Sequence, residues 1–159
     1  MPLSIGRLAN GVMTAPQPIP ADVPMVVTFV MSSHPRHLPV VRAAVGQLAA
    51  MVGWNESDSR AITLAVDEAL SNVIRHAYHG RVDGRMELQC HVTGDELEFR
   101  LRDTGEAPDL TRICARDIGC DKIGGLGTHI IRDVMDSVSY RASPDGNWFI
   151  ASKRFKGQK

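Results

Sequence analysis

The chain contains 159 residues, a length typical of one domain that can bury its own hydrophobic core. Its 18 Lys and Arg residues balance 18 Asp and Glu residues, so it lacks the one-sided charge typical of direct binding to nucleic acids or anionic membranes. The apolar runs are too short to span a bilayer, the N-terminus has no secretory hydrophobic region, and 3 cysteines form no even disulfide framework. We therefore expect a cytoplasmic protein.

The first half of the chain is predicted to form an arm, a strand and two helices. Residues 1–24 are rich in proline and lack periodicity, which indicates an extended arm before a single domain over residues 25–159. A β-branched, apolar run predicts a strand over residues 25–31. Spacing of 3.6 residues predicts one helix that ends at Gly53 and a second that starts after an Asn55 N-cap and ends near Tyr78.

The second half is predicted to form two hairpins separated by a long loop and a helix. The hairpins span residues 85–102 and 137–154, and the helix spans residues 125–135. This order of elements predicts an α+β fold, a two-layer sandwich with helices on one face of a mostly antiparallel mixed sheet. The stretch over residues 104–123 is long for a compact domain, so we interpret it as a lid over a ligand.

Polar side chains follow one edge of the second helix. Glu68, Asn72 and His76 are spaced four residues apart, which places them on one stripe beside the apolar face. A carboxylate can accept a proton and an amide oxygen can ligate a hard cation. We therefore expect Glu68 and Asn72 to face one cleft, with His76 in a supporting position.

Two further motifs suit a nucleotide. Asp103, Thr104 and Gly105 end a predicted strand, and the carboxylate could accept a hydrogen bond from a nucleobase amine. Gly124, Gly125 and Gly127 open the predicted helix of residues 125–135, where backbone N–H groups and the helix dipole favour phosphate. The ordered set of three motifs predicts an ATP–Mg²⁺ site.

These motifs resemble those of the GHKL (Bergerat-fold) ATPases, and specifically the anti-sigma factor serine/threonine kinases of that superfamily. The run Glu-Ala-Leu-Ser-Asn-Val-Ile-Arg-His-Ala-Tyr at residues 68–78 resembles the family's N box. Asp103-Thr104-Gly105 resembles its G1 box, and the run Gly-Gly-Leu-Gly-Thr-His at residues 124–129 resembles its G2 box. The resemblance covers approximately residues 25–155, with the boxes in the family's order.

The resemblance implies a role for each motif. Glu68 would be the general base, and Asn72 would be a ligand of Mg²⁺. Asp103 would accept a hydrogen bond from the adenine amine, and Gly105 would let the backbone approach the ring. The remaining cofactor-binding residues would meet the phosphates: Lys122, Gly124, Gly125, Leu126, Gly127 and Thr128.

The chain departs from the family's pattern at residues 106–108, after the G1 box, and again before the glycine turn. Ile123 stands where kinases of this branch often place a basic residue immediately before the glycine turn, and Lys122 lies one position earlier. Arg112, Arg116 and Lys122 are therefore alternative candidates for the cation that reaches the terminal phosphate.

The resemblance implies an ATP-dependent kinase that sequesters a sigma factor and phosphorylates a STAS-domain anti-sigma factor antagonist, and it implies a homodimer. The alternative is a nucleotide-responsive module that sequesters a partner without kinase activity. Glu68 favours the enzyme, because a purely binding module needs no base at this position. A detached catalytic domain of a sensor histidine kinase is the less favoured third interpretation, because no phospho-acceptor helix pair is expected before residue 25.

Overall fold

The structure is a computed structural model, and it describes residues 24–108 and 126–155. The predicted arm, apart from Pro24, and the lid segment beyond Pro108 therefore lie outside the described residues. None of the helices within the described ranges is both long enough and apolar enough to cross a membrane. The described elements, in chain order, are β1 (Met25–Ser32), η1 (Pro35–His37), α1 (Leu38–Val52), α2 (Glu56–Asn72), η2 (Val73–Ala77), β2 (Arg85–Thr93), β3 (Glu96–Asp103), α4 (Leu126–Val134), β4 (Ser137–Ser143) and β5 (Gly146–Arg154).

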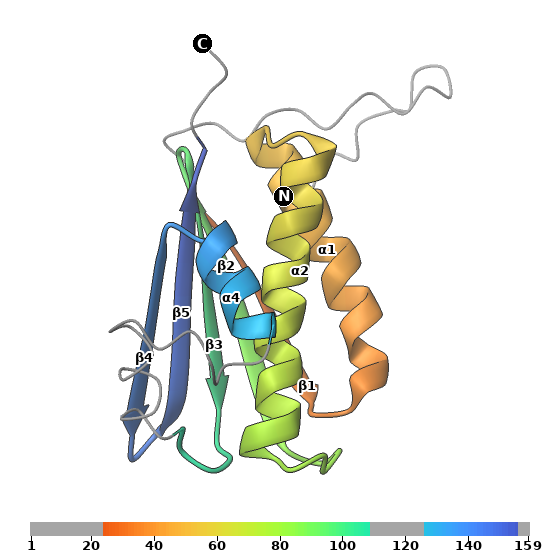
Figure 1. The fold of residues 1–159 in the computed structure, drawn as a ribbon, viewed down its shortest axis with the longest axis vertical. Helices are drawn as coiled ribbons and strands as arrows, with labels where there is room; N and C mark the ends of the chain where they lie inside the picture. Colours follow the sequence, from red (N-terminus) through yellow and green to blue (C-terminus); the bar gives the residue numbers. More distant parts are fainter. Residues whose placement is uncertain (1–23, 109–125, 156–159) are drawn as a thin grey trace, which may run out of the picture.

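The five strands form one sheet in the order β1-β2-β3-β5-β4. Each described pair of neighbouring strands is antiparallel. Figure 1 shows α1, α2 and α4 on one side of this sheet, so the fold is an α+β two-layer sandwich, as the order of elements predicts.

The core lies between the sheet and the helices. Alternate residues of the strands point toward the helices, and Leu97, Phe99 and Leu101 of β3 are fully buried there. Ile62, Val66 and Leu70 of α2 join the same cluster, because their spacing places them on one helical face. Burial of this continuous apolar surface supplies most of the stabilisation of the fold.

The first two helices end and begin as their sequences predict. Gly53 follows α1 with a φ of 117°, a left-handed conformation that glycine adopts without a Cβ penalty. Asn55 caps α2, and its Oδ1 accepts a hydrogen bond of 2.9 Å from the backbone N–H of Asp58. The second helical segment ends near Tyr78, as predicted, but its last turn is not α-helical.

The last turn of the second helical segment is a π-helix, η2, and not an α-helix. The N–H of Tyr78 bonds the carbonyl of Val73, five residues back, at 3.1 Å. The chain then leaves the helix through His79 and Gly80, both with positive φ. Single π-turns of this kind are found frequently at functional sites, and this one directly follows Asn72.

Candidate functional site

Helix α2 presents Glu68 and Asn72 beside its buried face. The helix packs against both α1 and α4, and Ala69 and Leu70, which lie between the two polar residues, are buried in the core. Glu68 keeps 23% of its side chain exposed, and Asn72 is half-buried. The two side chains are therefore held on a rigid element and are still accessible to a ligand.

Arg75 bridges these two residues, and we did not predict this contact. One guanidinium nitrogen, Nη2, donates to Glu68 Oε1 at 2.6 Å and to Asn72 Oδ1 at 3.0 Å. The sequence does contain the signal, because Arg75 lies seven residues after Glu68 and three after Asn72, spacings that share a helical face. His76, which we expected on this stripe, is exposed and makes no hydrogen bond to another described residue.

Asp103 lies at the end of β3, on the face that points to the core. Its side chain is nearly buried, with the residue only 5% exposed. Asp103 Oδ1 accepts hydrogen bonds from the N–H of Gly105 at 2.9 Å and from Nδ2 of Asn147 at 3.0 Å. Burial raises the pKa of this carboxyl, and the two hydrogen bonds partly oppose that rise.

Asn147 is a site residue that the sequence analysis missed. It stands directly opposite Asp103 in the β3–β5 register, and its Nδ2 also reaches the carbonyls of Gly105 and Glu106. An available signal was its position two residues before Phe149, on the inward-facing alternation of β5. The buried Asn147 amide donates to three acceptor oxygens, and it thereby fixes both the Asp103 carboxylate and the turn that follows it.

The turn after Asp103 is joined to the end of the second helical segment. Gly105 lies against Ala77 of η2, and a Cβ at residue 105 would approach the Ala77 carbonyl carbon to 2.7 Å. The N–H of Glu106 bonds the Ala77 carbonyl oxygen at 2.9 Å. This observation supplies a structural reason for glycine at position 105, separate from any contact with a nucleobase.

Tyr78 makes the second connection between these two segments. Its buried hydroxyl accepts a hydrogen bond of 3.0 Å from the N–H of Thr104 and donates to the carbonyl of Arg85. The fold therefore places the segment containing Glu68 and Asn72 and the segment containing Asp103 and Gly105 at the same end of the molecule.

The glycine motif lies mostly outside the described residues. Lys122, Gly124 and Gly125 are not described, and Leu126, Gly127 and Thr128 are described only as backbone at the start of α4. Helix α4 packs against α2, and in Figure 1 its first turn lies beside α2. The N-terminus of α4 is thus on the same side of the sheet as Glu68 and Asn72.

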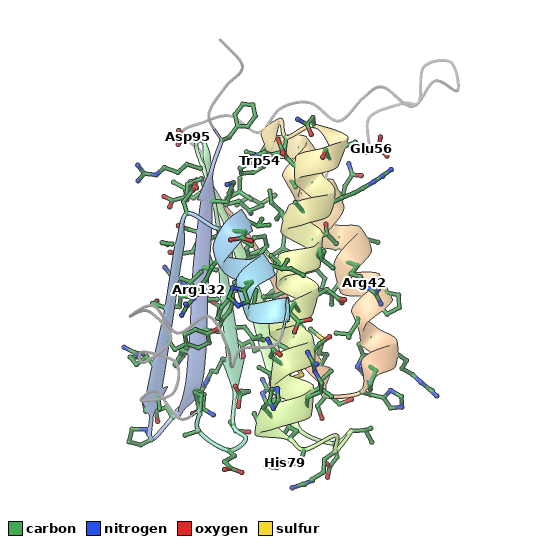
Figure 2. The ribbon with its side chains drawn as sticks, viewed as in Figure 1. Arg42, Trp54, Glu56, His79, Asp95 and Arg132 are labelled. Atoms are coloured by element: carbon green, nitrogen blue, oxygen red, sulfur yellow. The ribbon has the colours of Figure 1, made fainter. Side chains whose placement is uncertain are left out.

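A separate groove of about 540 Å³ lies between α1 and α2. It runs along Arg42, Trp54 and Glu56, which Figure 2 shows at a distance from His79 at the lower end of the second helical segment. Asp67 lines this groove, with its Oδ1 3.3 Å from Arg42 Nε. Neither Glu68 nor Asp103 lines the groove, so it is distinct from the candidate site.

The chain is similar to several known proteins. Residues 31–153 match the histidine kinase-like ATPase domain. The chain is 32% identical over 120 residues to the serine-protein kinase RsbW of Listeria innocua, an alignment that covers 70% of this chain and 76% of that protein. It is 26% identical over 115 residues to the serine-protein kinase RsbW of Bacillus subtilis, covering 67% of this chain and 71% of that protein.

A solved structure shows the same fold. The crystal structure of the RsbU and RsbW domains of a Mycobacterium tuberculosis protein matches with a TM-score of 0.59 at 17% sequence identity. The match covers 82% of this chain but only 32% of that longer protein. At this level of identity the likeness concerns the fold alone.

Proposed function

Because the chain belongs to the histidine kinase-like ATPase family, and within it to the RsbW-type serine-protein kinases, we propose that it transfers the terminal phosphate of ATP to a partner protein. The proposed acceptor is a serine or threonine of a STAS-domain anti-sigma factor antagonist. The proposed second partner is a sigma factor that the protein sequesters. The observation that carries the proposal is the joining of the Glu68–Asn72 segment to the Asp103–Gly105 turn through Ala77 and Tyr78.

Glu68 and Asn72 supply complementary chemistry. In the proposed reaction Glu68 accepts the proton of the attacking hydroxyl, and its partly exposed carboxylate leaves room for that hydroxyl. Asn72 offers an amide oxygen, a donor that suits Mg²⁺. Among the described residues no group of 3 or more His, Cys, Asp or Glu side chains could hold a metal by itself.

The donor set therefore fits a cation that takes some of its ligands from the protein and others from phosphate groups, as Mg²⁺ does in nucleotide sites. When bound, Mg²⁺ would supply neutralisation of phosphate charge. Asn72 would orient that assembly from a helix that the core holds rigidly, while Glu68 would lie one helical turn away.

The adenine end of the nucleotide is assigned to Asp103. Both described hydrogen bonds to this carboxylate end on Oδ1, so Oδ2 has no described donor and is the proposed acceptor for the adenine amine. Gly105, fixed by Asn147 and Ala77, would shape the adjoining backbone. The proposed phosphate contacts come from the backbone around Gly124, Gly125, Leu126, Gly127 and Thr128 and from a cation such as Lys122.

The proposal extends to the setting of the reaction. We infer a cytoplasmic homodimer, with residues 25–159 as the kinase domain and residues 1–24 as an arm outside it. The competing function is a nucleotide-responsive module that sequesters a partner and transfers no phosphate. Nothing in a purely sequestering module requires a partly exposed carboxylate beside a metal-binding amide, so Glu68 favours the kinase.

Glu68→Gln is the test that separates these functions. The amide keeps the volume of the side chain but cannot accept a proton, so single-turnover transfer from labelled ATP to a captured STAS-domain partner should fall by about 10²-fold or more. Equilibrium binding of ATP should change little. Glu56→Gln is the matched control, because Glu56 is also on α2 and paired with an arginine, yet lies at the opposite end of the helix.

Two results would count against the proposal. Equal transfer rates in the wild type and Glu68→Gln would remove the proposed role of Glu68. If the wild type binds its verified STAS-domain partner and ATP but transfers no phosphate, the sequestering module becomes the better description.

A further inference from the structure

Arg75 occupies the two atoms to which the proposed function assigns chemistry. Its Nη2 lies 2.6 Å from Glu68 Oε1, the proposed proton acceptor, and 3.0 Å from Asn72 Oδ1, the proposed metal ligand. Both contacts use the same nitrogen, so a movement of this nitrogen away from the helix edge releases both atoms. The protein thus provides its own positive charge at the position where a nucleotide-bound cation would be needed.

Arg75 and a divalent cation are poorly compatible at these atoms. If Asn72 Oδ1 ligated a cation at the usual distance of about 2.1 Å, the guanidinium now bonded to the same oxygen would stand beside it, and the two positive charges would repel. This repulsion favours molecules in which Arg75 has released Asn72 when this oxygen enters a coordination shell.

The structure makes such a release easy. The side chain of Arg75 is 55% exposed, so it can change rotamer without opening the core. Its Nε also donates to the Ser71 carbonyl at 3.3 Å, a contact on the outer surface of the helix. The π-turn that contains Arg75 leaves its backbone anchored through Ile74 and Tyr78, both buried, while the side chain moves.

We propose that Arg75 is a resident counter-cation, which holds Glu68 and Asn72 together in the metal-free protein and competes with Mg²⁺ for Asn72. This inference rests on the proposed function, because it assumes that Asn72 is the metal ligand. Its consequence is a reduced apparent affinity for Mg²⁺, since the ion binds best to molecules in which Arg75 has released Asn72. Arg75 thereby raises the Mg²⁺ concentration at which the site becomes loaded.

The experiment titrates Mg²⁺ at a fixed concentration of AMP-PNP, a non-hydrolysable ATP analogue. The binding of the analogue is measured at each Mg²⁺ concentration. In Arg75→Met the Mg²⁺ midpoint should fall by about three- to tenfold, the range expected when a partly exposed charged contact no longer has to be broken. Arg60→Met is the matched control, because Arg60 also pairs with a glutamate of α2, but at the far end of the helix, and its removal should leave the midpoint unchanged.

The outcomes distinguish this inference from the proposed function. If the wild type shows Mg²⁺-dependent binding of AMP-PNP and the midpoint of Arg75→Met is unchanged or higher, the counter-cation is disproved and the kinase proposal stands. If Asn72→Ala keeps the Mg²⁺ dependence of the wild type, or the wild type has none, Asn72 is not the ligand and both proposals fail. A lowered midpoint in Arg75→Met alone supports the counter-cation, and urea unfolding of each variant confirms that the fold is intact.

Discussion

Asp103 is the buried carboxylate of the candidate site. A carboxylate with a residue exposure of only 5% is poorly solvated, and burial raises its pKa accordingly. The N–H of Gly105 and the amide of Asn147 replace part of the lost water, and both bonds end on Oδ1. Within the described residues the two oxygens of this side chain therefore differ: Oδ1 accepts both hydrogen bonds, and Oδ2 is the oxygen that we propose for the ligand.

This asymmetry predicts the behaviour of Asp103→Asn. The new amide can keep its oxygen at the Oδ1 position, where two donors hold it, and would then present an N–H₂ group at the Oδ2 position. The preference for ATP over GTP should fall by about 10- to 100-fold, because a donor now faces the adenine amine but suits the guanine carbonyl oxygen. Competition binding of ATP and GTP measures this ratio.

Asp95→Asn is the control for the change of charge. Asp95 is exposed in the β2–β3 turn, at the end of the molecule opposite His79 in Figure 2. Its amide variant should keep the nucleotide preference of the wild type. An unchanged ATP-to-GTP ratio in Asp103→Asn would show that Asp103 does not read the base.

At the scale of elements, the junction between η2 and the end of β3 determines the geometry of the site. The π-turn brings Ala77 and Tyr78 against the turn that begins at Thr104. Gly105 permits this approach, since any larger residue would collide with the backbone of Ala77. Hydrogen bonds at the site itself, together with the apolar core, therefore fix the position of the second helical segment relative to the sheet.

Tyr78→Phe should weaken this junction. The substitution removes the hydroxyl that accepts from the Thr104 N–H and donates to the Arg85 carbonyl, and it leaves both groups without that partner in a partly buried place. The free energy of unfolding should decrease by about 1–3 kcal/mol, measured by urea denaturation. Nucleotide affinity should decrease as well, because the Asp103 turn loses a contact with η2.

Tyr140→Phe serves as the matched control for a deleted hydroxyl. Tyr140 packs against Phe149 with ring centroids 5.2 Å apart, and its hydroxyl makes no hydrogen bond within the described part of the chain. Its variant should unfold close to the wild-type urea midpoint and keep nucleotide affinity. A loss in Tyr140→Phe equal to that in Tyr78→Phe would argue against a specific role for the Tyr78 hydroxyl.

At the scale of the whole molecule, one continuous core joins the sheet to the helices. Cys90 lies in the middle of this core, on β2, and is fully buried. Burial raises the pKa of its thiol to about 12, so almost no thiolate is present near neutral pH. A buried, protonated thiol reacts only when the structure around it opens.

Cys90 should therefore report global unfolding. In a variant with Cys114→Ser and Cys120→Ser, labelling by a disulfide reagent at pH 8 should be at least about 10³-fold slower than that of an unprotected thiol, because only the rare unfolded molecules react. The rate should rise with urea in parallel with unfolding monitored by circular dichroism. Rapid labelling of the folded variant without urea would show that β2 opens locally.

The sequence by itself determined the approximate position of each described strand and α-helix, but not the short elements η1 and η2. A strand over residues 25–31 is observed as Met25–Ser32, and a helix over residues 125–135 as Leu126–Val134. These patterns depend on local alternation and 3.6-residue spacing, which the chain contains regardless of its partners. The three motifs and their order were also recognisable in the sequence, and they indicated the family to which the chain belongs.

Only the tertiary structure decided how the motifs meet. The contact between Asn147 and Asp103 depends on the pairing of β5 with β3. The two residues are 44 apart in the chain, and no local sequence pattern predicts which residues of the two strands lie opposite each other. The π-turn after Asn72 meets the turn at Thr104 and Gly105 through Ala77 and Tyr78, and helical periodicity alone does not predict this change of helix type. The same periodicity placed His76 on the stripe of Glu68 and Asn72, whereas Arg75 makes the contacts. Local periodicity specifies which face of an element is apolar, whereas the contacts between elements specify which polar groups share a site.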